Sequence, residues 1–233
     1  MTTLFLLRHG RSSANTKGVL AGRKAGVHLD DTGRSQAAAA AERLREVPLD
    51  LMVSSPLERC LETIEPVAAG RRRKVQTDEG LIEADYGRWS GKKLSDLAKD
   101  PLWPVVQSHP SAVTFPGRTG EAMTTMAARA TGAVRRHNAK VGPGGVWLAC
   151  SHGDVIKAIV ADALGLHLDQ FQRIVIDPAS ITVIRYTEHR PFVVVTNSTS
   201  GPLAQYVVED AGSDASVGGG AGHAAAPRRG RTR

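Results

Sequence analysis

The chain has 233 residues, of which 41% are hydrophobic and 23% charged, and it carries a formal net charge of +7. This composition is typical of a globular domain and excludes a disordered or fibrous protein. The positive charge favours anionic partners such as phosphate esters. An aromatic content of 4% argues against the base-stacking surfaces of single-strand binders, and we expect no nucleic-acid partner.

The first half of the chain alternates short apolar segments with helical ones, as strand–helix–strand units do. The helix-forming residues include a run of alanines over 37–41, and Asp30 is a good helix cap. The predicted elements are, in order, a strand over 4–7, a helix from Asp30 to Pro48, a strand over 49–54, a helix from Ser55 and Pro56 to about Ala69, and a weak strand over 75–77.

The second half opens with a glycine- and tryptophan-rich loop region and then returns to alternating elements. We expect a loop over 84–118 with a short helix near 94–98, helices over 120–140 and from 151 to about 164, and strands over 145–150, 173–176, 180–186 and 192–196. Strands that alternate with helices predict an α/β fold: a three-layer α/β/α sandwich with a mostly parallel central sheet.

The composition changes near Ala211, where a Gly-, Ala- and Arg-rich sequence begins. We therefore predict a catalytic domain over 1–210 and a disordered tail over 211–233. No segment reaches the roughly 18 apolar residues of a membrane span. The N-terminal apolar stretch is too short for a signal peptide, and the two cysteines form no metal-type or redox-type pair. We expect a cytoplasmic protein that does not bind membranes.

Two histidines occupy matching positions, each after an apolar strand and before a glycine. His9 precedes Gly10, and His152 precedes Gly153. Ligands of open α/β sheets bind outside the carboxyl ends of the strands, so both imidazoles are expected in one crevice. A glycine at each position lets a phosphate approach the backbone.

Three charged residues could serve the same crevice. Arg8 precedes His9, and Arg59 lies in the helix after the second strand, where a guanidinium could bind two phosphoryl oxygens at once. Glu83 follows a predicted strand and could protonate a leaving group if burial raised its pKa. Each residue also has a structural interpretation, as a core histidine, a solvated arginine or a surface glutamate. No histidine pair has metal-ligand spacing.

Together these residues carry a family resemblance. Leu6-Leu7-Arg8-His9-Gly10 with Ser12 and Asn15 resembles the signature of the histidine phosphatase superfamily, in its phosphoglycerate-mutase-like branch. Further blocks resemble the family in the same order: Gly18, Gly22, Leu29, Gly33 and Gln36-Ala37; Ser54-Ser55-Pro56-Leu57 with Arg59; Glu83, Gly87, Trp89 and Gly91; and Ser151-His152-Gly153.

The resemblance implies a role for each matched residue. His9 would be the nucleophile and Glu83 the proton donor, with Arg8, Arg59 and His152 in the phosphate pocket. The substrate would be bound at the mouth by Ser12, Asn15, Gly22 and Arg23. No metal or other cofactor is implied.

The sequence also departs from the family pattern. Arg11 replaces the usual Glu or Gln, which would add positive charge near the mouth and favour a polyanionic substrate. The segment from Gly91 to Glu121 is short, and Arg118 is its only arginine, whereas glycolytic mutases of the family carry a longer insertion with paired arginines.

We therefore expect a phosphomonoesterase that hydrolyses a small phosphorylated metabolite. A phosphomutase that retains the phosphohistidine and a non-catalytic phospho-ligand binder are the alternatives. The sequence does not name the substrate, and it leaves the oligomeric state open, with a homodimer as one alternative.

Overall fold

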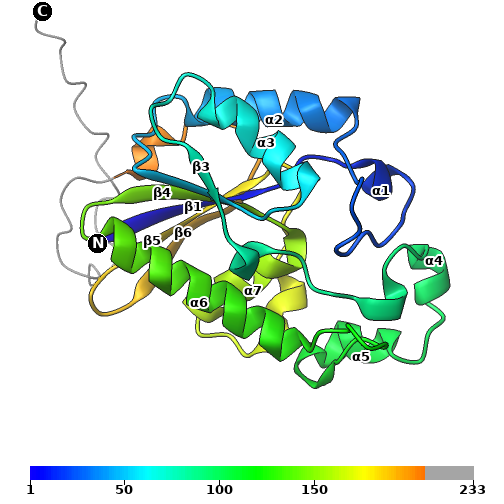
Figure 1. Ribbon diagram of the computed structural model, residues 1–233. Coiled ribbons are helices and arrows are strands. Elements are labelled where there is room, and N and C mark those ends of the chain that lie inside the picture. The colour runs from blue at the N-terminus through cyan, green and yellow to red at the C-terminus, as the bar shows by residue number, and fades with distance from the viewer. Residues whose placement is uncertain (208–233) are drawn as a thin grey trace, which may run out of the picture.

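The computed structural model describes residues 1–207, so the tail predicted over 211–233 lies outside the described residues. A single six-stranded sheet runs through the molecule in the order β3-β2-β4-β1-β5-β6 (Figure 1). Neighbours among β1 to β4 pair in parallel, whereas β5 is antiparallel to β1 and to β6. The strands are β1 (Thr2–Arg8), β2 (Leu51–Ser54), β3 (Val75–Thr77), β4 (Val146–Ser151), β5 (Ile181–Tyr186) and β6 (Pro191–Ser198).

Helices cover both faces of this sheet, which confirms the predicted three-layer sandwich. In Figure 1, α2 and α3 lie on one face and α6 and α7 on the other. The α-helices are α1 (Ser13–Thr16), α2 (Asp31–Leu44), α3 (Glu58–Ala68), α4 (Leu94–Leu97), α5 (Trp103–Ser108), α6 (Met123–Val141) and α7 (Gly153–Ala163). The 3-10 helices are η1 (Glu79–Leu81), η2 (Gly87–Trp89), η3 (Pro110–Ala112), η4 (Leu168–Arg173) and η5 (Ala204–Tyr206).

The central strand β1 shows why the fold is stable. Leu4 and Leu6 pack with residues of α6 and α7, whereas Phe5 and Leu7 pack with residues of α2 and α3. All four side chains are completely buried. Burial of such a side chain stabilises the folded state by about 1.5–3 kcal/mol. Because alternate residues of β1 point to opposite faces of the sheet, this one strand contributes to both hydrophobic cores.

The helix after β2 begins later than predicted. We expected it to open at Ser55 and Pro56, but α3 starts at Glu58. The residue before a proline is disfavoured in the helical conformation, so Ser55 stays outside the helix. The short connection leaves the Ser55 hydroxyl buried beside His152, at the carboxyl ends of the strands.

The strand predicted over 173–176 is wrong. Residues 168–173 form η4, and the three residues after it belong to no strand. Ile174 and Ile176 are buried while Val175 is 61% exposed, which explains the alternating pattern without a sheet partner. The carbonyl of Ile176 instead accepts a hydrogen bond from Arg8 Nη1 at 2.6 Å.

The region over 84–118 is more ordered than a loop. It contains the predicted short helix as α4, and also α5 and η3. Trp89 is 2% exposed, with its ring centroid 6.1 Å from that of Trp103 and 5.5 Å from that of Phe115. Trp89 is thus a packing residue that joins the parts of this region to one another. No helix within residues 1–207 is long and apolar enough to cross a membrane.

Candidate active site

His9 lies immediately after β1, at the carboxyl end of the sheet, and is 4% exposed. Its Nδ1 lies 2.7 Å from the carbonyl oxygen of Gly10. A carbonyl only accepts, so Nδ1 carries the hydrogen and Nε2 keeps its lone pair. Burial, reinforced by the charges of Arg59 and Arg8, holds the pKa of His9 well below its usual value. The imidazole is therefore neutral at neutral pH, with Nε2 available as a nucleophile.

His152 follows the neighbouring parallel strand β4 and faces His9, with 5.3 Å between the ring centroids. Arg59 Nη2 donates to its Nδ1 at 3.2 Å, so Nε2 carries the hydrogen and donates to Ser55 Oγ at 2.7 Å. Burial and the Arg59 charge lower the pKa of His152 as well. The two histidines thus meet in one cluster, as the parallel strands predicted.

Two guanidinium groups lie at this cluster. Arg59 is 2% exposed and also donates through Nη2 to the carbonyl of Gly22 at 2.9 Å. Its Nη1 and the Nε of Arg8 are buried without a hydrogen-bond partner among the described residues. Buried N–H groups of charged side chains are costly to leave unpaired. Both atoms are therefore suited to an anion that binds beside the histidines.

Glu83 approaches His152 from the segment after η1, with 3.9 Å between its Oε2 and His152 Nδ1. Its Oε1 accepts from the backbone N–H of Ala84 at 2.9 Å. Burial, followed by the negative charge of Asp154, raises the pKa of Glu83 to about 7, against the opposing effect of Arg59. A carboxyl group that is protonated near neutral pH is suited to general acid catalysis.

This arrangement can be compared with known proteins. A sequence model of the histidine phosphatase superfamily (branch 1) matches residues 4–199. The chain belongs to the histidine phosphatase superfamily. It is 30% identical to Phosphoserine phosphatase 1 of Hydrogenobacter thermophilus, over 90% of this chain and 98% of that protein.

Two further comparisons cover most of the chain. It is 26% identical to the 2,3-bisphosphoglycerate-dependent phosphoglycerate mutase of Thermoplasma acidophilum, over 79% of this chain and 87% of that protein. The solved structure of Bacillus stearothermophilus YhfR superposes with a TM-score of 0.79 at 28% identity, covering 86% of this chain and 98% of that one. The family and these relatives indicate a phosphatase or mutase of the histidine phosphatase type.

Of the four residues predicted to bind substrate at the mouth, Gly22 and Arg23 contact the cluster. Gly22 has a φ of +55°, and a Cβ there would lie 2.6 Å from Ser90 Oγ, so only glycine fits. Arg23 Nε donates to the backbone carbonyl of Glu83 at 2.7 Å. Arg23 therefore supports the segment that carries the predicted proton donor.

The other two predicted residues, Ser12 and Asn15, bind each other. The Ser12 hydroxyl accepts from Asn15 N–H at 3.3 Å, and Asn15 Oδ1 accepts from Ser12 N–H at 3.0 Å. This capping box gives Ser12, which is 1% exposed, a structural role. A direct contact of either residue with substrate stays a prediction.

Arg11 pairs with groups at the start of α2. Its Nε pairs with Asp30 at 2.7 Å and its Nη2 donates to Thr32 at 2.7 Å, while 41% of the side chain is exposed. A selection of polyanionic substrates by Arg11 stays a prediction. Among residues 1–207, no group of three His, Cys, Asp or Glu side chains is placed to hold a metal ion.

Several residues without a predicted role support the site. Thr63 Oγ1 accepts from Gly10 N–H at 2.9 Å and donates to the Arg59 carbonyl at 2.6 Å. Tyr86 donates to Asp154 Oδ2 at 2.9 Å, which joins the segment after Glu83 to the first turn of α7. The Ser-Ser-Pro sequence at the end of β2 was a signal for Ser55, but the other contacts are long-range and leave no local pattern.

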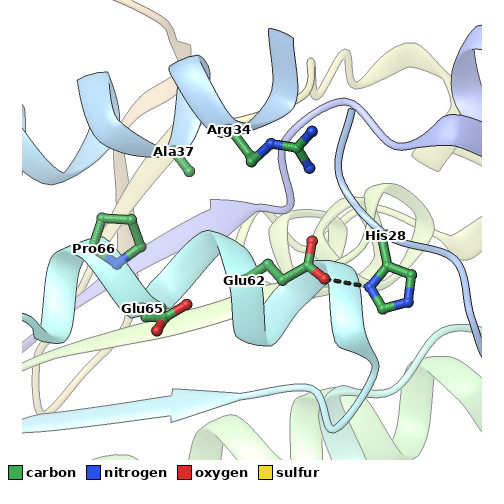
Figure 2. A pocket seen from close by; sticks show the side chains of 6 residues that line it. All are labelled: His28, Arg34, Ala37, Glu62, Glu65 and Pro66. Atoms are coloured by element: carbon green, nitrogen blue, oxygen red, sulfur yellow. Dashed lines mark hydrogen bonds and ion pairs between the residues drawn. The ribbon is translucent and has the colours of Figure 1, made fainter. Parts of the chain in front are cut away.

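A separate hollow of about 380 Å³ lies between α2 and α3, and none of the predicted site residues lines it (Figure 2). An ion pair between His28 and Glu62 crosses it, and Glu62 also accepts from the backbone N–H of Leu29 at 2.8 Å. These contacts tie the loop before α2 to α3. His28 thereby provides a surface histidine outside the cluster, useful as a control for His9.

The Glu83 pKa predicts a pH dependence. If Glu83 is the proton donor, kcat/KM for an alkyl phosphate should fall as the pH rises above about 7, because the Glu83 carboxyl group then loses its proton. The leaving group of an activated aryl phosphate needs little protonation, so its kcat/KM should fall less. Both esters lose a proton from their own phosphate group in the same pH range, so that ionisation affects the two profiles equally. Parallel pH profiles for the two esters check this. Identical profiles would contradict the assignment of the descending limb to Glu83.

Proposed function

We propose that this chain is a phosphomonoesterase that hydrolyses a small phosphorylated metabolite through a phosphohistidine on His9. The observation that carries the proposal is the neutral, oriented imidazole of His9 beside two guanidinium groups with unpaired, buried N–H groups. A phosphoryl group supplies acceptors for both guanidinium groups and an electrophile for the imidazole.

The geometry supports a two-step reaction. His9 Nε2 attacks phosphorus as the ester P–O bond breaks, and Glu83 gives its proton to the departing alkoxide. Arg8 and Arg59 stabilise the charge on the phosphoryl oxygens, with His152 beside them. The Glu83 carboxylate then takes a proton from water, whose oxygen attacks the phosphohistidine and releases inorganic phosphate. No step requires a metal ion.

Hydrolysis is favoured over phosphoryl transfer to a second alcohol by the segment between Gly91 and Glu121. A mutase must hold the other end of its substrate and exclude water from the phosphohistidine. This segment has Arg118 as its only arginine and is occupied by the packed helices α4 and α5. The similarity to a phosphoserine phosphatase over nearly the whole chain also supports hydrolysis. Because a phosphoglycerate mutase is also among the relatives, phosphoryl transfer to a second alcohol is the alternative reaction.

Incubation with a phosphorylated metabolite distinguishes the two reactions. With 3-phosphoglycerate, with phosphoserine and with sugar monophosphates, we expect inorganic phosphate to appear in the ³¹P NMR spectrum, with no positional isomer ahead of it. Activity should be unchanged by a chelator. Isomer that forms faster than free phosphate, or a requirement for a bisphosphate primer, would establish the mutase instead.

A further inference from the structure

Arg129 of α6 binds the backbone of the segment that ends in Glu83. Its Nη1 donates to the carbonyls of Ile82 at 2.6 Å and Gly80 at 3.0 Å, and more weakly to that of Glu79 at 3.4 Å. Its Nη2 donates to the carbonyl of Glu83 at 3.1 Å. One side chain therefore holds the carbonyl groups of four residues within the stretch 79–83.

Glu121 orients this guanidinium. Arg129 Nε and Nη2 donate to its two carboxylate oxygens at 2.7 Å and 2.9 Å. The same carboxylate accepts from Arg23 Nη2 at 2.9 Å and from the backbone N–H of Asp85 at 3.2 Å. The Arg129 and Glu121 side chains are only 20% and 11% exposed. Bidentate, charge-assisted pairs that are shielded from water are well ordered, so the fork of Arg129 is held in one orientation.

The contacts fix the main chain of Glu83 and leave its carboxyl group to the active site. Its carbonyl accepts from both Arg129 and Arg23, while its Oε2 lies 3.9 Å from His152 Nδ1. Close packing supports the arrangement, because a Cβ at Gly80 would lie 2.7 Å from the Cβ of Ala133 on α6. The backbone before Glu83 thus rests directly on α6.

We propose that Arg129, oriented by Glu121, is a positioning residue that holds Glu83 within reach of the leaving-group oxygen. This inference rests on the proposed function, because it concerns the proton donor of that reaction. A general acid must come within about 2.6–3.2 Å of the atom it protonates. A displacement of about 1 Å can cost on the order of 10²-fold in rate. A purely stabilising role for Arg129 would instead affect all substrates alike.

The test uses Arg129→Gln and two esters that differ in their need for a proton. For an alkyl phosphate, we expect the rate of leaving-group release to fall about 10–100-fold. For p-nitrophenyl phosphate, whose leaving group needs little protonation, it should fall less than about 3-fold. Arg135→Gln is the matched control, since Arg135 lies on the same helix and its one side-chain contact within residues 1–207 is an exposed ion pair with Asp162. In a Glu83→Gln background, Arg129→Gln should add no further loss for the alkyl ester.

Equal losses for both esters, or a full additional loss in the Glu83→Gln background, would show that Arg129 only stabilises the fold and would overturn the proposal. If Arg129→Gln does not melt cooperatively, Glu121→Gln is the second variant. It keeps the shape of the side chain and should give a smaller loss with the same preference for the alkyl ester. A wild-type protein that releases phosphate from neither ester would remove the proposed function and the positioning role together, whereas an active wild type with equal losses overturns the positioning role alone.

Discussion

Replacement of His9 by alanine is expected to lower phosphatase turnover by at least about 10³-fold, since His9 is the nucleophile of the proposed reaction. Of the two imidazoles in the cluster, that of His152 has both nitrogens engaged, by Ser55 and Arg59. His9 alone of the pair has a ring nitrogen free to attack. The measurement is phosphate release from an alkyl ester by the purified variant.

His28→Ala is the matched control for this substitution, because His28 lies at the hollow between α2 and α3 (Figure 2). It should keep wild-type turnover. Circular dichroism and thermal melting of both variants establish that the fold is retained. Turnover of His9→Ala within about tenfold of the wild type would contradict the mechanism, since loss of a covalent nucleophile is far more costly.

Glu83→Gln is expected to separate substrates by leaving group. The glutamine keeps the shape of the side chain but cannot donate the acid proton, so an alkyl phosphate should react about 10²–10⁴-fold more slowly. A p-nitrophenyl ester should be affected far less in the release of its leaving group. Burst kinetics of that release, measured for both esters, isolate this step from the later hydrolysis of phosphohistidine.

Asp85→Asn is the control for Glu83→Gln, because Asp85 lies in the same segment. Its Oδ1 accepts from the backbone N–H of Gly87 at 2.9 Å, which gives it a local structural role. The control should not discriminate between the two esters. If Glu83→Gln slows both esters equally, or if Asp85→Asn shows the selective loss, Glu83 is not the acid.

Much of the fold was predictable because its four inner strands, β1, β2, β4 and β5, are buried on both faces. The continuous apolar runs of β1 and β4 and the alanine-rich α2 carry strong local signals. The wrong strand over 173–176 shows where such signals fail. Ile174 and Ile176 alternate with exposed Val175, but these residues belong to no strand of the described sheet. Tertiary packing sets the conformation of this segment, and the local hydrophobic pattern of the sequence does not reveal that packing.

The five residues predicted to be catalytic lie in one cluster. His9 and His152 directly follow parallel strands, Arg8 ends β1 and Arg59 lies in the first turn of α3, whereas Glu83 reaches the cluster from the segment after η1. Their roles remain predictions until the reaction is measured. The hydrogen bonds that hold these residues in place could not be predicted in the same way. Arg129 meets Glu83 across 46 positions, and Tyr86 meets Asp154 across 68. Contacts of this kind depend on how α6 and α7 pack, so the sequence around each residue gave no sign of them.

Trapping of the covalent intermediate tests the central claim most directly. Wild-type protein is mixed with an alkyl phosphate labelled with ³²P, quenched within milliseconds under alkaline conditions that preserve phosphohistidine, and digested for peptide mapping. We expect the label on His9, and its decay should match the appearance of inorganic phosphate. Label on a serine, or phosphate release without any labelled protein at a time resolution faster than turnover, would contradict the account.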